Sequence, residues 1–337
     1  MKHLKIIYLL LAALVACLAS CEKEVEFNSQ YDDGIALYAI ATPGQPFSLR
    51  ISRSFSVNNN PTRMFSSYSE YYNEIDTLYH AQIVIKNATA QLVVNNTDHY
   101  TLVYNDTSPY LYTCDYTPQA GDEIAISVKA PGYKDVHASA HIEVPQQVDI
   151  VNTEVVYKHN GDDGTKLVEN PLDRYGVDSV MIITMRLSDP PKSHNFYRLK
   201  VRGVANREEL LFGWYIDKFY SVNDVFTSDD IIFLDNQLSK PYGDWEAGMS
   251  NVFDDHLFDG QDYTFTVETR KRYGDNARVI VELETLNADL YYFLKSYMLY
   301  RISTDDVYLA PIGLYSNIDN GWGILGTLSY DRHILYY

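Results

Sequence analysis

Strict alternation of apolar and polar residues constrains the fold of this chain more than any other feature. Every second residue from 136 to 144 is apolar, and residues 124–128 alternate in the same way. A period of two is typical of β-strands that bury one face. Residues 130–135 (APGYKD) lie between these runs and contain a Pro-Gly pair suited to a turn. The pattern therefore predicts a β-hairpin.

The same pattern continues on the N-terminal side of this hairpin. Residues 82–85 and 90–94 predict another pair of strands. Several short strands within about 110 residues favour an immunoglobulin-like β-sandwich over residues 34–145. Cys114 has no second cysteine in this segment, which excludes the disulfide-linked version of that fold.

A second β domain is expected over residues 146–337, as a sandwich or a partial barrel, with the boundary at Pro145-Gln146-Gln147. Residues 177–187 and 196–204 have the composition of strands. Residues 263–268 and 278–286 also alternate, and Gly274-Asp275-Asn276 between them predicts a second hairpin. The fold class is thus all-β with one or two helices.

One amphipathic helix is predicted near residues 287–302. Its apolar stripe consists of Leu290, Phe293, Leu294, Tyr297 and Met298, which recur with a period of 3.6 residues. Asn287 is suited to cap the start, and Asp289 lies in the first turn, where it complements the helix dipole. The stripe is expected to pack on the second domain.

Residues 1–20 have the layout of a signal peptide, with Lys2 and Lys5 before a short apolar run. Leu18-Ala19-Ser20-Cys21 resembles a bacterial lipobox, which implies that Cys21 is acylated and becomes the new N-terminus. An ordinary cleaved signal is the alternative. Residues 21–33 are interpreted as the lipidated N-terminus and a spacer. Their acidic residues also resemble an export signal, and a merely solvated linker fits as well. We expect an outer-membrane protein facing the cell surface, with the periplasmic face as the alternative.

The charge balance narrows the choice of partners. The chain carries a formal net charge of −18. Nucleic-acid binding depends on Lys and Arg neutralising phosphates, so no nucleic-acid partner is expected. An acidic surface also disfavours docking on anionic headgroups, which leaves membrane attachment to the lipid on Cys21. The 30 tyrosines suit either glycan and peptide contacts or half-buried strand positions.

Motifs that indicate catalysis are missing from the sequence. There is no Gly-x-Ser-x-Gly elbow, His-Glu-x-x-His helix, phosphate-binding loop or dinucleotide fingerprint. We therefore expect no enzyme, no cofactor and no metal site. Acidic pairs occur at residues 162–163, 229–230, 254–255 and 305–306, and residues 160–164 come nearest to a calcium loop. Plain turns explain these pairs equally well.

Several segments in order resemble one family. They are the lipobox, residues 47–54 (FSLRISRS), 116–121 (YTPQAG), 130–133 (APGY), 253–261 (FDDHLFDGQ) and 310–326 (APIGLYSNIDNGWGILG). The order is similar to domain-of-unknown-function family 4249, a group of outer-membrane lipoproteins. The resemblance implies genes beside TonB-dependent receptors and an accessory role at the surface. It supplies no catalytic residues.

These observations favour a lipid-anchored accessory or binding subunit of a TonB-dependent uptake system. The expected ligand is a glycan or peptide, held on aromatic loops. The residues predicted to contact it are Tyr68, Tyr71, Tyr72, Trp214, Tyr215 and Trp245. Two alternatives stay open. One is a structural adhesin or pilus-like subunit, and the other is a hydrolase that uses Asp254 or Asp255.

Overall fold

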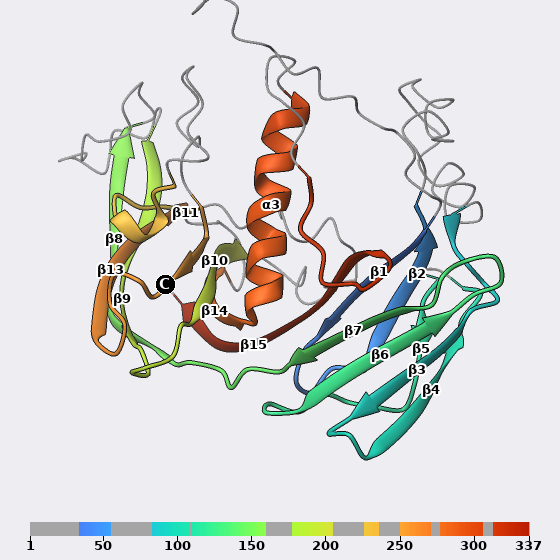
Figure 1. The fold of residues 1–337 in the computed structure, drawn as a ribbon. Helices are drawn as coiled ribbons and strands as arrows, with labels where there is room; N and C mark the ends of the chain where they lie inside the picture. The colour runs from blue at the N-terminus through green and yellow to red at the C-terminus, as the bar shows by residue number, and fades with distance from the viewer. Residues whose placement is uncertain are drawn as a thin grey trace, which may run out of the picture.

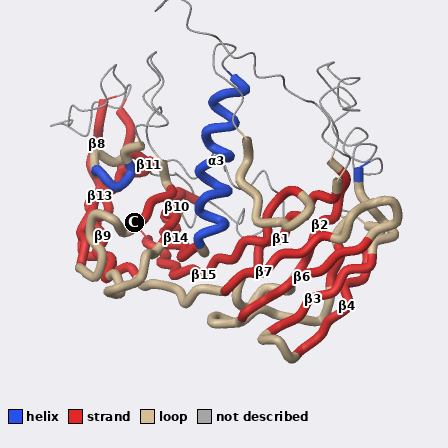
Figure 2. Tube along the Cα trace, viewed as in Figure 1, coloured by secondary structure: helices blue, strands red, loops and turns tan. Residues whose placement is uncertain are grey.

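Strands dominate the computed structural model, which describes residues 34–54, 83–107, 110–159, 177–204, 226–235, 250–270, 277–305 and 313–336 (Figures 1 and 2). The predicted all-β class with a helix near the C-terminal end is confirmed. The strands are β1 (Ile35–Ala41), β2 (Ser48–Arg53), β3 (Thr89–Val94), β4 (Asp98–Tyr104), β5 (Tyr112–Thr113), β6 (Glu123–Lys129), β7 (Val136–His141), β8 (Val148–His159), β9 (Val177–Ser188), β10 (Phe196–Val204), β11 (Phe226–Thr227), β12 (Val252–Asp254), β13 (Asp262–Arg270), β14 (Arg278–Leu286) and β15 (Trp322–Tyr336). The helices are the 3₁₀ turn η4 (Ile231–Phe233) and α3 (Ala288–Asp305).

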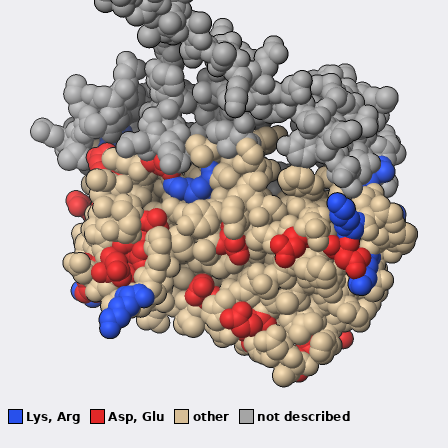
Figure 3. Space-filling model, viewed as in Figure 1, with Lys and Arg blue, Asp and Glu red and all other residues tan. Residues whose placement is uncertain are grey.

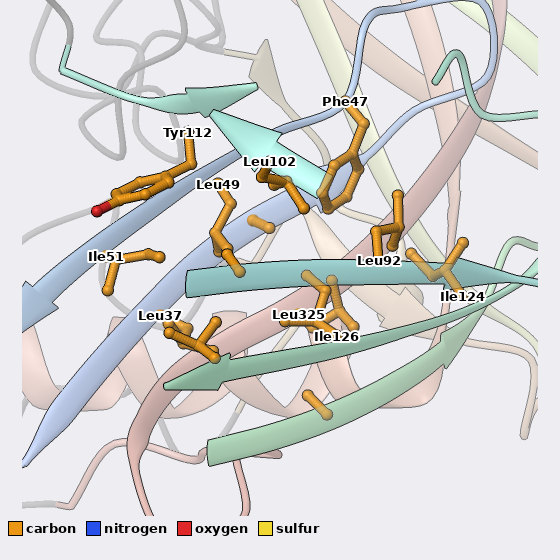
Figure 4. Packing of buried hydrophobic residues seen from close by; sticks show 14 of the residues in the cluster. Leu37, Phe47, Leu49, Ile51, Leu92, Leu102, Tyr112, Ile124, Ile126 and Leu325 are labelled. Atoms are coloured by element: carbon orange, nitrogen blue, oxygen red, sulfur yellow. The ribbon is translucent and has the colours of Figure 1, made fainter. Parts of the chain in front are cut away.

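The first unit folds β1–β7 and the start of β15 around one apolar core, in the strand order β15-β1-β2-β5-β4-β3-β6-β7. Figure 4 shows Leu37 and Leu49 from β1 and β2 packed with Leu92 and Ile126 from β3 and β6. Leu325, from β15, belongs to the same core. The sandwich therefore takes its last strand from the far end of the chain.

The hairpin predicted for the first unit is confirmed, since β6 and β7 pair antiparallel through the turn at residues 130–135. Only the end of the alternation departs from the prediction, because Val144 follows β7 and is exposed. The predicted pairing of residues 82–85 with 90–94 is wrong. Val84 bridges Ser52 of β2, whereas β3 pairs with β4 and β6. Periodicity identifies a strand but does not identify its neighbour.

The second unit is a sandwich of two sheets around a separate core. One sheet has the order β12-β10-β14-β15 and the other β11-β13-β9-β8. The hairpin predicted from residues 263–268 and 278–286 is therefore wrong, because β13 and β14 lie in different sheets. Every residue of β14 is buried, which requires covered faces and a neighbour on each edge. Its neighbours are β10 and β15.

Strand β15 belongs to both units. Residues 322–327 pair parallel with β1, and residues 328–336 pair antiparallel with β14. Figure 1 shows this strand in red, curving beneath α3 from one unit to the other. At the crossing point the Thr327 hydroxyl donates to the carbonyl of His141 at 2.5 Å. A single continuous strand thus fixes the two sandwiches to each other.

Helix α3 packs where the units meet. Leu290, Phe293, Leu294 and Met298 are buried as the stripe predicted, and Tyr297 is half-buried. Their cluster also includes Phe196 of β10 and Ile324 and Leu328 of β15. The predicted cap is confirmed, because Oδ1 of Asn287 accepts from the amide of Leu290 at 3.2 Å. The described residues include no helix with the length and hydrophobicity needed to cross a bilayer.

Candidate functional site

A groove of about 370 Å³ opens between η4, β12 and the first half of α3. We call it the η4–α3 groove. Asp230 shapes one wall, because its carboxylate accepts from the amide of Ile232 at 3.1 Å and from the hydroxyl of Tyr263 at 2.8 Å. The short turn buries Ile232 and directs Ile231 outwards. A capped turn thus presents apolar side chains to one side of the groove.

The opposite wall contains a carboxylate with several partners. Oδ1 of Asp254 contacts Nδ1 of His256, and Oδ2 lies 3.3 Å from the hydroxyl of Tyr291 and 3.6 Å from Nε2 of His194. Burial alone would raise the pKa of Asp254. The hydrogen bonds from His256 and the nearby imidazoles outweigh burial and lower the pKa below its usual value. Asp254 is therefore held as an anion at the groove.

A second ion pair spans the floor. Nζ of Lys295, on α3, contacts Oδ2 of Asp235 and lies 5.9 Å from the centre of the Tyr291 ring. The Lys295 and Asp235 side chains are only 23% and 12% exposed, so water screens this pair weakly. The arrangement joins the end of the η4 turn to the helix. Among the described residues that line the groove, Lys295 is the only lysine or arginine, beside the carboxylates of Asp235 and Asp254.

Asp255 has hydrogen-bond partners that its neighbour Asp254 does not share, although Nε2 of His194 lies 3.6 Å from both carboxylates. Oδ2 of Asp255 accepts from the backbone and side-chain nitrogens of Asn195 at 2.7 and 3.1 Å. Asp189 lies close by and accepts from Tyr197 at 2.6 Å and from the amide of Gly260 at 2.9 Å. Burial and the charge of Asp189 raise the pKa of Asp255. The two members of the acidic pair predicted for a hydrolase thus have different hydrogen-bond partners with His194 near both, and Asp255 is only 1% exposed.

Three carboxylates of this cluster are close enough to share a cation. One oxygen from each of Asp189, Asp255 and Asp259 lies within 4.8 Å of the others. Oxygen ligands at such spacing suit a hard cation such as Ca²⁺. However, the oxygens of Asp189 and Asp255 already accept the hydrogen bonds that close the β9–β10 and β12–β13 turns. The internal hydrogen bonds explain the cluster without an ion.

A buried ionic network occupies the α3-facing side of β10 and β14. Glu284 contacts Arg198, and its other oxygen lies 2.6 Å from Nζ of Lys200. Burial would raise the pKa of Glu284, but the charges of Arg198 and Lys200 hold that pKa well below its usual range. Glu282 pairs in turn with Arg332 of β15 at 2.6 Å. These pairs join three strands and belong to the framework of the site.

The segment 313–326, which carries the clearest family motif, has a structural role. The Tyr315 hydroxyl donates to Asp289 at 2.5 Å. Asn317 accepts from the amide of Leu325 and donates to the carbonyl of Leu325, each at 3.0 Å. Gly323 has φ of +100°, and a Cβ there would lie 2.0 Å from the carbonyl oxygen of Leu37. We refer to Asn287, Asp289, Asn317, Gly323 and Thr327 as the β15 clasp.

The residues proposed from the sequence as ligand contacts lie elsewhere in the chain. Cys21 and the aromatic residues Tyr68, Tyr71, Tyr72, Trp214, Tyr215 and Trp245 are outside the described residues. The pairs at 162–163 and the whole of the 160–164 segment are outside them too. His137 and His141 lie on β7, and His141 pairs with Glu123 at 2.9 Å. Burial raises the pKa of the Cys114 thiol.

The residues that line the η4–α3 groove had little signal in the sequence. Ile231 and Leu234 come from a single turn, and Leu257 comes from another turn that follows β12. Neither segment is long enough to show a period. Lys295 lies on the predicted helix, and its position gave no sign of a binding role. The one sequence feature that pointed to this site was Asp254, which belongs to an acidic pair and is followed two positions later by His256.

The family motifs identified in the sequence lie in both units of the fold. A family model, Domain of unknown function (DUF4249), matches residues 22–334. The chain belongs to DUF4249. The match covers both units of this DUF4249 protein, including the β15 clasp and the groove walls. No curated protein and no solved structure matches the chain.

Proposed function

We propose that this DUF4249 protein is a lipid-anchored binding subunit at the outer membrane. It captures an oligomeric nutrient, glycan or peptide, for a TonB-dependent transporter. The η4–α3 groove is the observation that carries the proposal. Its volume of about 370 Å³ lies within the range of ligand sites, and it combines apolar walls with a few fixed charges.

The distance from the lipid to the fold supports an anchored role. Cys21 precedes Ile35, the first residue of β1, by fourteen residues. A chain of that length spans at most about 50 Å when fully extended. Acyl chains on Cys21 would therefore keep the first unit within about 50 Å of the bilayer. A capture protein at that height can meet a transporter in the same membrane.

The surface charge supports the lipid as the membrane attachment. The face shown in Figure 3 carries more acidic than basic side chains, consistent with the net charge of −18. Anionic headgroups repel such a surface. Attachment therefore depends on the acyl chains rather than on a basic patch.

The alternative functions gain no comparable support. A pilus-like subunit usually exchanges a terminal strand, but β15 lies between β1 and β14 and takes part in both units. Processing of such subunits requires cleavage near the N-terminus, but Arg50 and Arg53 lie inside β2, where cleavage would cut the sandwich. A hydrolase built on the acidic pair would need Asp255, whose Oδ2 is already bonded to Asn195.

Affinity purification from native membranes tests the proposal. The wild-type lipoprotein, extracted in mild detergent, is expected to co-purify with a TonB-dependent receptor identified by mass spectrometry. The Cys21→Ser variant serves as the control, because it lacks the thiol that is acylated and should lose the receptor. Recovery of the wild-type protein alone would contradict the transporter part of the proposal.

A further inference from the structure

Three exposed aliphatic side chains surround the η4–α3 groove. Ile231, Leu234 and Leu257 are 60%, 56% and 45% exposed, and they come from both sides of the opening. Single exposed apolar residues are ordinary on protein surfaces. A group of them around one concavity is typical of an interaction site. The rim is therefore suited to hold a branched apolar group.

The floor of the groove is polar and acidic on balance. Among the described residues that line it, Asp235 and Asp254 supply two carboxylates, and Lys295, which pairs with Asp235, supplies the one lysine. The Asp254 and Asp235 side chains are only 18% and 12% exposed. Weak screening strengthens their attraction for a cationic ligand and their repulsion of an anionic one. The charge thus favours a neutral or cationic ligand.

The aromatic side chains of the groove argue against a sugar ligand. Tyr291 and Phe253 line it, but they are only 9% and 3% exposed, since their rings pack inside the second unit. Among the described lining residues, neither ring therefore offers an open face on which a sugar ring could stack. A peptide instead supplies aliphatic side chains, backbone hydrogen bonds and a positive charge in one ligand. These are the groups that the rim and the floor complement.

We propose that the η4–α3 groove binds a short peptide. An aliphatic side chain of the peptide lies between Leu234 and Leu257, and a cationic group points towards Asp254 and Asp235. This inference rests on the proposed function as a binding subunit and names the class of ligand. The site lies apart from the aromatic loops predicted from the sequence.

Calorimetry with defined tripeptides tests the groove. The probe is Leu-Lys-Leu, compared with Leu-Glu-Leu and Ser-Lys-Ser, against the purified lipoprotein in detergent. Leu-Lys-Leu should bind most tightly. Leu234→Asp and Leu257→Asp should each weaken its binding by about tenfold or more. Val103→Asp is the matched control, because Val103 is 66% exposed on β4 of the other unit and should leave the affinity unchanged.

Leu234→Ala provides a second variant in case the charged substitution disturbs folding, and it should also weaken binding. Equal affinity of the groove variants and wild type would overturn the proposal, as would no binding at millimolar peptide. Maltotriose is titrated in parallel. Maltotriose binding that Leu234→Asp abolishes would reassign the groove to a glycan.

The two proposals fail separately. If the protein binds the peptide but no transporter co-purifies from membranes, the proposed peptide site stands and the proposed transporter partner is disproved. If a transporter co-purifies but the protein does not bind Leu-Lys-Leu, the proposed role as a transporter subunit stands and the proposed peptide ligand is disproved. The calorimetry and the purification are therefore read independently.

Discussion

The β15 clasp and the η4–α3 groove use similar polar residues in opposite ways. In the clasp, Asn317 brackets the backbone of Leu325, and Asp289 accepts from both Tyr315 and Asn317. Nearly every polar atom there has an internal partner that holds a strand in place. In the groove, paired charges lie beneath aliphatic side chains that are open to solvent. Polar groups whose hydrogen bonds are all made inside the protein, as in the clasp, indicate a structural role. Apolar side chains that are exposed around paired charges, as in the groove, are typical of an interaction surface.

The largest expected effect comes from Gly323→Ala in the clasp. A methyl group there meets the carbonyl of Leu37 on a backbone with φ of +100°. We expect a loss of about 4 kcal/mol or more in the free energy of unfolding, measured by urea denaturation. Gly313→Ala is the control, because nothing lies within 4 Å of a Cβ at that position. An unchanged denaturation midpoint for Gly323→Ala would show that β1 and β15 do not pair so closely.

Asn317→Ala should destabilise the clasp less than Gly323→Ala does. It leaves the amide and carbonyl of Leu325 without their side-chain partner, which should cost about 1–3 kcal/mol in the free energy of unfolding. Gln119→Ala, at an exposed amide, should change stability by less than about 0.5 kcal/mol. If the two variants unfold at the same urea concentration, the role of Asn317 in the clasp is disproved.

Substitutions of two adjacent isoleucines distinguish the exposed rim of the groove from the buried residues that support it. Ile232 is 8% exposed and Ile231 is 60% exposed. Ile232→Ala should lower the free energy of unfolding by about 2–5 kcal/mol. Ile231→Ala should change it by less than about 0.5 kcal/mol. Thermal denaturation of both variants makes the measurement, and a similar loss in each would mean that the rim is part of the core.

The smallest effect is a pH dependence at Asp254. Its pKa in the folded protein is lowered, so its stabilising effect is present above its unfolded pKa of about 3.9 and is lost as pH falls through the folded pKa. The stability advantage of wild type over Asp254→Asn should therefore shrink as the pH falls below about 4. Denaturation of both proteins over the acidic range checks this. An advantage that grows as the pH falls below about 4 would reverse the assigned sign.

Local patterns in the sequence predicted local structure well. The β6–β7 hairpin and α3 with its Asn287 cap follow from neighbouring residues and are confirmed. Pairings that depend on distant strands did not follow. Strand β14 alternates like a hairpin partner of β13, but tertiary packing places it between β10 and β15. Period-two patterns specify which face of a strand is buried and leave its edge partners undetermined.

The groove was harder to predict than the fold for a related reason. Leu234 and Leu257 come from turns on either side of β12, and Lys295 comes from a helix after β14. Only the sandwich brings these residues together. The acidic pair at 254–255 did indicate this part of the chain, but only Asp254 lines the groove. Asp255 is buried against Asn195, and the sequence does not distinguish the two positions.

The parallel pairing of β1 with β15 has a consequence for folding during synthesis. Leu37 needs Gly323 as its neighbour, so a ribosome must add almost 300 further residues before β1 gains that edge. A chain still being synthesised exposes the open edge of β1 for that whole interval, which favours aggregation or binding by a chaperone. Completion of the first sandwich therefore depends on the synthesis of β15. An early stop codon would leave both sandwiches without it.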